Sequence, residues 1–149
     1  MAANNLVLLV EDDASDARLV QRAFLKMGLP IEVVRLSNGD EAVAYLAGDS
    51  PYDNRKLYPM PSVVLLDIKL PRRSGLEVLR WVRGQPYGLK RLPIVMLTSS
   101  RHATDVNRAY DLGANSYLAK PENTGDLGRL AQHFHDYWLQ LNENPDVQN

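Results

Sequence analysis

Four consecutive apolar residues that run directly into an aspartate constrain the fold of this chain more than any other feature. They occupy positions 63–66, the first two are β-branched valines, and Asp67 follows them. A strand that is apolar on both faces is typical of the interior of a parallel sheet with helices on both sides. Pro71 and Gly75 then mark a loop. Because open α/β sheets bind ligands at the carboxyl ends of their strands, Asp67 is predicted to lie at a ligand-binding edge.

The same alternation of short apolar runs and amphipathic segments extends over the whole chain. Further strands are predicted at residues 6–10, 31–36, 93–97 and 116–119. A helix is predicted after each strand: one capped by Ser15 or Asp16, one at about 41–47, one ended by Gly84, and two at about 104–112 and 124–141. With right-handed crossovers this (βα)5 order predicts an α/β fold, a doubly wound parallel sheet flanked by helices.

Composition limits the classes of function. The 149 residues suffice for one domain, which we expect to span residues 1–141 and to be followed by a polar tail at 142–149. With 17 basic and 18 acidic residues the net charge is −1, which gives no reason to expect nucleic acid or an acidic membrane surface as a partner. The chain has no cysteine and no apolar run near the ~18 residues of a membrane span. A cytoplasmic protein is therefore expected.

Polar residues follow the predicted strands at the edge where Asp67 lies. Glu11 and Asp12 follow the first strand, Thr98 the fourth and Lys120 the fifth. Carboxylate oxygens suit Mg²⁺, and an ammonium together with the metal would balance the clustered negative charge. An aspartate held in this way can attack phosphorus to form an aspartyl phosphate. The metal, the lysine and the hydroxyl would then stabilise the phosphoryl oxygens.

Four short motifs resemble the receiver domains of two-component response regulators. They are Val-Glu-Asp-Asp at 10–13, Leu-Asp-Ile-Lys-Leu-Pro at 66–71, Leu-Thr-Ser at 97–99 and Tyr-Leu-Ala-Lys-Pro at 117–121. Each is weak alone, but they occur in the family's order and spacing over nearly the whole chain. The resemblance implies a flavodoxin-like receiver fold with strand order 2-1-3-4-5.

The resemblance also implies the role of each site residue. Asp67 would be the phosphoacceptor, and the Mg²⁺ or Mn²⁺ ligands would be Glu11, Asp12, Asp67 and the backbone carbonyl of Lys69. Lys120 would contact the phosphoryl group, and the Lys120–Pro121 bond would be cis. Thr98 and Tyr117 would act as the switch residues. Since three acids stand in a row where the family has two, Asp13 is an alternative contributor to the metal site.

The implied function is a single-domain response regulator that accepts a phosphoryl group from a sensor histidine kinase. The long loop at 48–61 and the ending at 133–139 narrow the resemblance to regulators that serve phytochrome kinases. No output domain is expected after residue 141, so the signal would pass through protein contacts, without enzymatic activity toward another substrate. The alternative is a Mg²⁺-dependent phosphatase or phosphotransferase that forms an aspartyl phosphate. Haloacid-dehalogenase-type enzymes carry a second aspartate two residues after the nucleophile, where this chain has Lys69.

The last predicted helix carries a wide apolar stripe that ends in Phe134, Tyr137 and Trp138. One interpretation is that the stripe packs on the domain's own helices. The other is that it is an interface, because aromatic side chains are enriched in the centres of protein interfaces. On the second interpretation we predict a symmetric homodimer through this helix and its neighbouring face.

Overall fold

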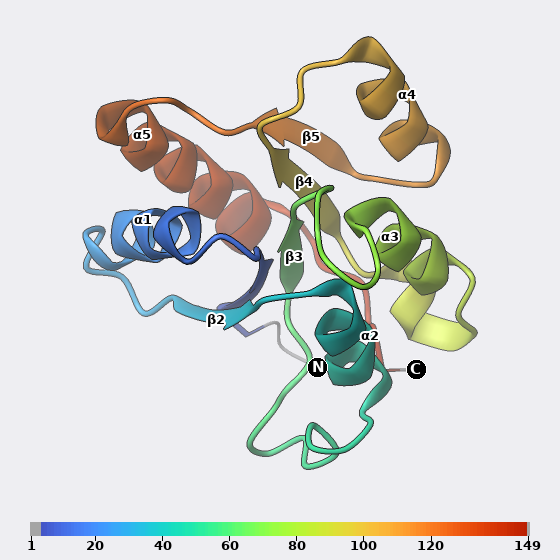
Figure 1. Ribbon diagram of the computed structural model, residues 1–149. Helices are drawn as coiled ribbons and strands as arrows, with labels where there is room; N and C mark the ends of the chain where they lie inside the picture. The colour runs from blue at the N-terminus through green and yellow to red at the C-terminus, as the bar shows by residue number, and fades with distance from the viewer. Residues whose placement is uncertain (1–3, 149) are drawn as a thin grey trace.

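The computed structural model describes residues 4–148 and shows a five-stranded sheet with helices on both faces (Figure 1). The strands lie in the order β2-β1-β3-β4-β5, and every neighbouring pair is parallel. Their bounds are β1 Leu6–Val10, β2 Glu32–Leu36, β3 Val63–Leu66, β4 Ile94–Thr98 and β5 Ser116–Ala119. The predicted α/β class, (βα)5 order and strand order are therefore confirmed.

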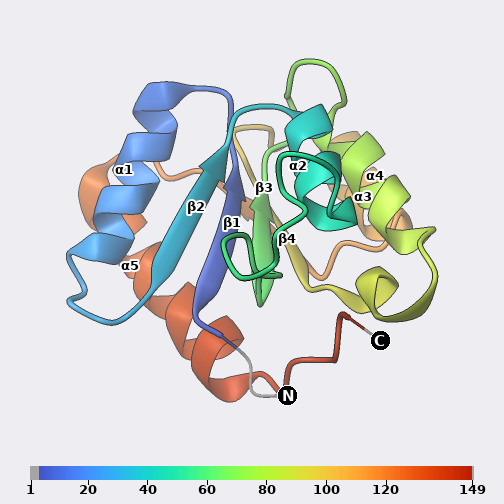
Figure 2. The same ribbon diagram turned by 90° about the horizontal axis from the view of Figure 1, so that it is seen from below.

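The helices divide into two layers (Figure 2). On one face lie α1 (Ala14–Leu25) and α5 (Thr124–Phe134), which pack on each other. On the other face lie α2 (Gly39–Ala47), α3 (Gly75–Arg83) and α4 (Ala103–Asp111). None of the helices among residues 4–148 has the length and apolar character that crossing a membrane requires.

Side chains of the central strands alternate between the two helical layers, as the pleat of a strand requires. One set packs with α1 and α5, and the other packs with α2 and α3. The first set comprises Val7, Leu9, Val63 and Leu65, and the second comprises Leu8, Val10, Val64 and Leu66, all at most 2% exposed. This double burial explains why β1 and β3 are apolar throughout, and it fixes which residues emerge at their carboxyl ends.

Side-chain caps fix where two helices beside the predicted site begin. Asp13 caps α1, since its carboxylate accepts a hydrogen bond of 2.9 Å from the backbone N–H of Asp16. The helix thus starts earlier than the predicted caps at Ser15 and Asp16 allow. Ser74 caps α3 through a reciprocal capping box with Glu77.

The last predicted helix is not uniform. The α-helix ends at Phe134, and residues His135–Leu141 continue in π-helical form as η2. Phe134 packs edge-to-face on Phe24 of α1, with ring centroids 5.7 Å apart. A short 3-10 helix, η1 (Tyr87–Arg91), stands between α3 and β4 and was not predicted.

The long loop at 48–61 is ordered by aromatic and cationic contacts. Tyr52 and Tyr58 pack against each other and against Tyr45 of α2, with ring centroids 5.2 to 6.0 Å apart. The Arg55 guanidinium donates hydrogen bonds to the carbonyls of Tyr45, Leu46 and Tyr58. The bonds to Tyr45 and Leu46 hold the loop to carbonyls in the last turn of α2, where the regular helical hydrogen bonds end.

The C-terminal segment packs against the helical layer that contains α2 and α3. Val147 packs against the core shared by α2 and α3, and the Asp146 carbonyl accepts a hydrogen bond of 2.8 Å from Arg91. Gly88 lies so close that an added Cβ would meet the Asp146 oxygen at 2.6 Å. The polar tail therefore contacts the domain at Asp146 and Val147.

Candidate functional site

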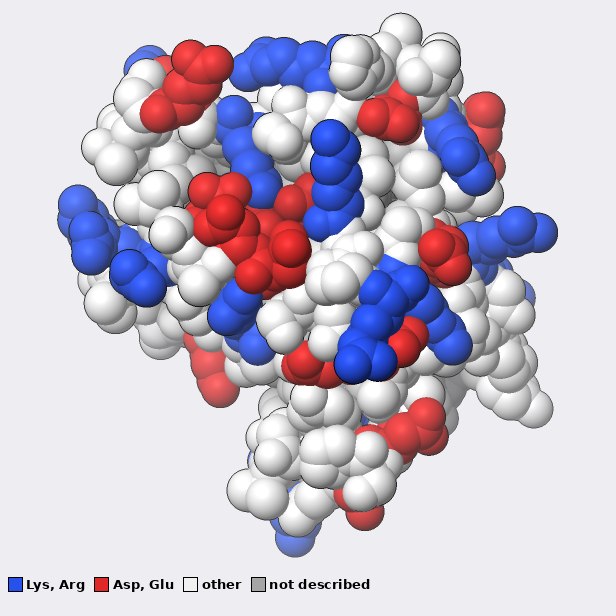
Figure 3. Space-filling model, in the orientation of Figure 1, with Lys and Arg blue, Asp and Glu red and all other residues white. Residues whose placement is uncertain are grey.

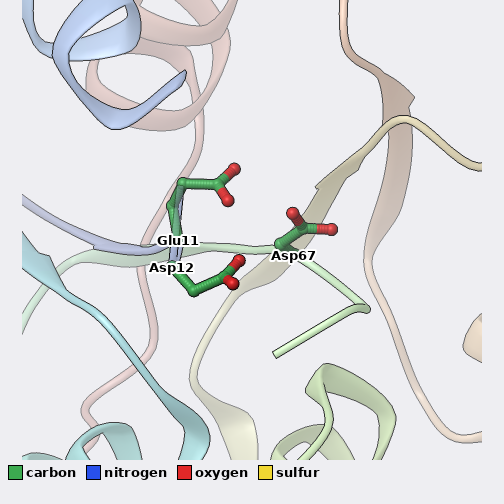
Figure 4. A group of neighbouring side chains, drawn as sticks. All are labelled: Glu11, Asp12 and Asp67. Atoms are coloured by element: carbon green, nitrogen blue, oxygen red, sulfur yellow. The ribbon is translucent and has the colours of Figure 1, made fainter. Parts of the chain in front are cut away.

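Three carboxylates meet at the carboxyl edge of the sheet. Glu11 and Asp12 directly follow β1 and Asp67 directly follows β3, and the two strands are neighbours with Val10 opposite Leu66. One oxygen from each carboxylate lies within 4.8 Å of the others (Figure 4). Figure 3 shows acidic side chains gathered at this edge beside α1. The sequence-based prediction that these three residues converge agrees with the structure.

Lys120 supplies the positive charge for this cluster from the end of β5. Its Nζ lies 2.5 Å from an oxygen of Glu11, 2.9 Å from Asp67 and 3.0 Å from Asp16. Its backbone N–H donates to the Thr98 carbonyl at 2.8 Å, which ties the lysine to the end of β4. Lys120 therefore contacts three carboxylates from different parts of the chain. Two of these carboxylates, Glu11 and Asp67, are predicted site residues.

Burial gives the cluster its electrostatic character. Glu11 and Asp67 are 2% and 6% exposed, whereas Asp12 is exposed. Burial raises the pKa of Glu11 to about 7; the hydrogen bond from Lys120 opposes this rise and the charge of Asp67 adds to it. For Lys120, burial disfavours the ammonium, but hydrogen bonds to Glu11, Asp67 and Asp16 outweigh it and raise its pKa. One ammonium thus faces several carboxylates, and the site retains excess negative charge.

The donor set fits a divalent cation. Carboxylate oxygens are hard ligands of the kind that Mg²⁺ and Mn²⁺ prefer, and Glu11, Asp12 and Asp67 offer three at mutually compatible distances. Lys69 lies two residues beyond Asp67, in a turn held by hydrogen bonds from Leu70 and Gly75 to the Ile68 carbonyl. The Lys69 carbonyl takes no part in those bonds, and its role as a further ligand stays a prediction.

The two predicted switch residues lie on β4 and β5, the strands that Lys120 joins through its backbone hydrogen bond to Thr98. Thr98 is the last residue of β4 and is fully buried. Tyr117 of β5 is half-buried, and its hydroxyl donates a hydrogen bond of 2.9 Å to the carbonyl of Ser100, two residues past Thr98. Burial raises the pKa of the Tyr117 hydroxyl. The tyrosine is thus anchored to the loop that follows β4 at the carboxyl edge of the sheet.

Two expectations about individual residues are corrected. The bond between Lys120 and Pro121 is trans; Ser50–Pro51 is the cis bond among residues 4–148. The trans isomer is the favoured form of a bond before proline. With this bond trans, Lys120 still contacts Glu11 and Asp67. Phe134 is only 3% exposed because it fills the core between α1 and α5, so its ring cannot line an interface. Tyr137 is 52% exposed and Trp138 packs partly on the same core.

Two residues near the cluster escaped the sequence analysis. Asp16 appeared there only as a helix cap, yet its carboxylate binds Lys120. The sequence signal for this contact was the position of Asp16 in the first turn of α1, three residues after the cap Asp13 and close to the acidic residues that follow β1. Arg35 was not among the predicted site residues, yet its guanidinium binds the backbone carbonyls of Glu11 and Asp12.

Comparison with known proteins gives the class to which this fold and site belong. The sequence profile of the response regulator receiver domain matches residues 7–132. The chain therefore belongs to the response regulator receiver domain family.

Relatives narrow the class further. The chain is 38% identical to "Response regulator Rcp1" of Synechocystis over 135 residues, which cover 91% of this chain and 89% of that protein. A crystal structure of the phosphorylated cyanobacterial phytochrome response regulator RcpA superposes with a TM-score of 0.88 at 36% identity, covering 97% of this chain and 100% of that one. The Mn²⁺-bound form of Rcp1 superposes with a TM-score of 0.84 at 38% identity, covering 95% and 99% of the two chains. This chain is thus a receiver domain related to phytochrome response regulators.

Proposed function

We propose that this protein is a single-domain response regulator of a phosphorelay, with Asp67 as phosphoacceptor. The observation that carries the proposal is the contact of Lys120 with both Asp67 and Glu11 in a carboxylate cluster on a receiver fold. The match to Rcp1 and RcpA covers 89% and 100% of those chains, which supports a role as a response regulator of the same kind.

The geometry suits transfer of a phosphoryl group from a phosphohistidine. The Asp67 oxygen that Lys120 does not hold attacks phosphorus; the new P–O bond forms as the P–N bond to the imidazole breaks, and the imidazole leaves with the electron pair. Lys120, already 2.9 Å from Asp67, is placed to bind an oxygen of the transferred group. When bound by Glu11, Asp12 and Asp67, Mg²⁺ or Mn²⁺ would offset the negative charge that gathers on the phosphoryl oxygens.

The phosphoryl donor we propose is a histidine kinase of the phytochrome class. The support is the similarity to RcpA, which is described as a cyanobacterial phytochrome response regulator, and to RPA3017 of R. palustris, described in red light signalling, with a TM-score of 0.88 at 28% identity. Mixing the protein with candidate kinases and measuring its intact mass would identify the donor.

A small phosphodonor tests the proposal without a kinase. Incubation with acetyl phosphate and Mg²⁺ is expected to add one phosphoryl group, which chelation of the metal should prevent and peptide mapping should place on Asp67. Rapid turnover of a phosphate ester without accumulation of the adduct would favour the alternative, a phosphatase or phosphotransferase. Absence of both adduct and turnover would contradict the proposal.

We expect Thr98→Ala to accept the phosphoryl group but lose its effect on the rest of the domain. In the proposed switch the Thr98 hydroxyl moves toward the new phosphoryl oxygens, and the Tyr117 ring enters the space it leaves. That movement would break the hydrogen bond from Tyr117 to the Ser100 carbonyl. Hydrogen exchange across α4, β5 and α5, with and without phosphodonor, measures the response.

The control for this experiment is Thr104→Ala, which removes an exposed hydroxyl from α4. It should retain the exchange response of the wild type. A full response in Thr98→Ala would rule out the proposed route through the threonine.

We also propose a homodimer through the last helical segment. With Phe134 in the core, the apolar side chains available there are Tyr137, 52% exposed, and Leu141, 74% exposed, with Trp138 beside them. Sedimentation at tens of micromolar, roughly the range of weak association, should show a dimer that the double variant Tyr137→Ser, Leu141→Ser weakens. The control Leu57→Ser removes a side chain of similar exposure, 70%, from the loop at 48–61, outside the last helical segment. A wild type that stays monomeric with and without phosphodonor would reject the dimer.

A further inference from the structure

The edge strand β2 contributes one charged side chain to the loop that carries Glu11 and Asp12. Arg35 lies opposite Leu9 in the β1–β2 pairing. Leu9 in turn precedes Glu11 by two residues. Its Nε donates to the carbonyl of Glu11 and its Nη2 donates to the carbonyl of Asp12, both at 2.9 Å. The guanidinium thus spans the backbone of two consecutive residues of the carboxylate cluster.

We propose that Arg35 is a positioning residue for the metal site: it holds the backbone of Glu11 and Asp12 so that their carboxylates converge with that of Asp67. This inference rests on the proposed function, because it concerns the same site.

Other hydrogen bonds fix only part of this loop. The N–H of Glu11 donates to the Leu36 carbonyl at 3.0 Å, which continues the β1–β2 pairing, and the N–H of Asp13 donates to the Glu11 carboxylate at 3.2 Å. The two carbonyls between them are bound by Arg35. A planar guanidinium with two parallel N–H groups can hold both at once, which a single ammonium cannot do with the same geometry.

The location of this charge argues against two simpler roles. Asp12 directly precedes Asp13, the cap of α1, and a cation near the amino end of a helix opposes the helix dipole. Arg35 therefore does not act by stabilising α1 electrostatically. Nor can its charge favour a metal ion, since a fixed cation repels a divalent cation nearby. Its benefit to the site would have to come from geometry.

The two explanations therefore predict opposite changes in Mn²⁺ affinity when Arg35 is replaced. If Arg35 positions the carboxylates, Arg35→Met should weaken Mn²⁺ binding about tenfold, the lower range for loss of a group that orients metal ligands. If the arginine acted through charge alone, the same variant should bind Mn²⁺ more tightly. The free Mn²⁺ signal in electron paramagnetic resonance, titrated with protein, measures the affinity directly and requires no phosphorylation.

Four further variants complete the experiment. Arg35→Lys keeps the charge but not the paired N–H groups of the guanidinium. Arg35→Gln keeps an N–H donor and serves if Arg35→Met does not fold. Both variants should bind Mn²⁺ more weakly than the wild type. Arg80→Met removes an exposed arginine of α3 and should bind normally. Asp12→Asn changes a proposed ligand itself and gives the reference for direct loss of affinity.

A second readout separates positioning from a general structural role. With acetyl phosphate, raising the Mg²⁺ concentration should restore the phosphorylation rate of Arg35→Met to near the wild-type maximum, because its defect lies in metal affinity. Unchanged or tighter Mn²⁺ binding in Arg35→Met, with or without a loss of thermal stability, would overturn the inference. A wild type that binds no Mn²⁺ would instead overturn the proposed function, so the two failures are distinguishable.

Discussion

Asp67→Asn is expected to abolish phosphoryl labelling while the domain stays folded. The amide is neutral, is a poor nucleophile toward phosphorus and is a weaker ligand for a divalent cation than the carboxylate. The side chain keeps its size and its loss of charge relieves repulsion with buried Glu11. The substitution weakens the contact with Lys120, but that ammonium keeps Glu11 and Asp16 as partners, so we expect the core around β3 to stay folded. Intact mass after incubation with acetyl phosphate and Mg²⁺ measures labelling, and circular dichroism confirms the fold.

Asp53→Asn provides the matched control. Asp53 is an exposed aspartate of the loop at 48–61 and is not one of the three clustered carboxylates, so the same chemical change there should leave labelling as in the wild type. If Asp67→Asn were labelled to the wild-type level, with the adduct mapped to position 67, the assignment of the phosphoacceptor would be wrong. Label moved to another carboxylate would show only that the edge tolerates a substitute acceptor.

The convergence of the site could be predicted because parallel strands end at one edge of a sheet. Glu11 and Asp67 directly follow the buried strands β1 and β3, and Lys120 directly follows the half-buried strand β5, so the backbone alone brings the three residues together. Only the strand order was needed to place the ends of β1 and β3 side by side. For these residues, position along the chain was enough.

The contributions of Asp16 and Arg35 could not be predicted in the same way. Both act through the reach and rotamer of a side chain: Asp16 turns from α1 toward Lys120, and Arg35 extends from β2 across to a neighbouring loop. Apolar periodicity says which face a residue occupies, but it does not say which polar partner a long side chain selects.

Burial along the last helix shows a second limit of prediction from the sequence. The width of an apolar stripe signals that a helix has more than one apolar contact, but it does not assign each residue to one of them. Phe134 packs on Phe24 within the protomer, whereas Tyr137, less than one helical turn later, is exposed. The change to π-helical form at His135 alters the angular spacing of the residues that follow, so the faces they occupy could not be read from a regular α-helical pattern.

Gly75→Ala is expected to destabilise the domain by about 2 kcal/mol or more, a typical cost of overpacking, and to slow phosphorylation. Gly75 begins α3, and a Cβ there would meet the carbonyl oxygen of Asp67 at 1.9 Å and the Cα of Ile68 at 2.9 Å. These are backbone atoms, so no flexible side chain can move aside. Relief requires the end of β3 to shift, and a shift of about 1 Å in a reacting group can cost roughly a hundredfold in rate.

A second glycine supplies a control of opposite sign. Gly128 lies inside α5, and an added Cβ has no heavy atom within 4 Å, so Gly128→Ala should stabilise the fold by about 0.5–1 kcal/mol through helix propensity alone. Urea unfolding with unchanged slope measures both variants, and combining them allows Gly75→Ala to be studied even if it is unstable alone. If Gly75→Ala were as stable as the wild type and labelled at the same rate, the close approach of α3 to Asp67 would not constrain the site.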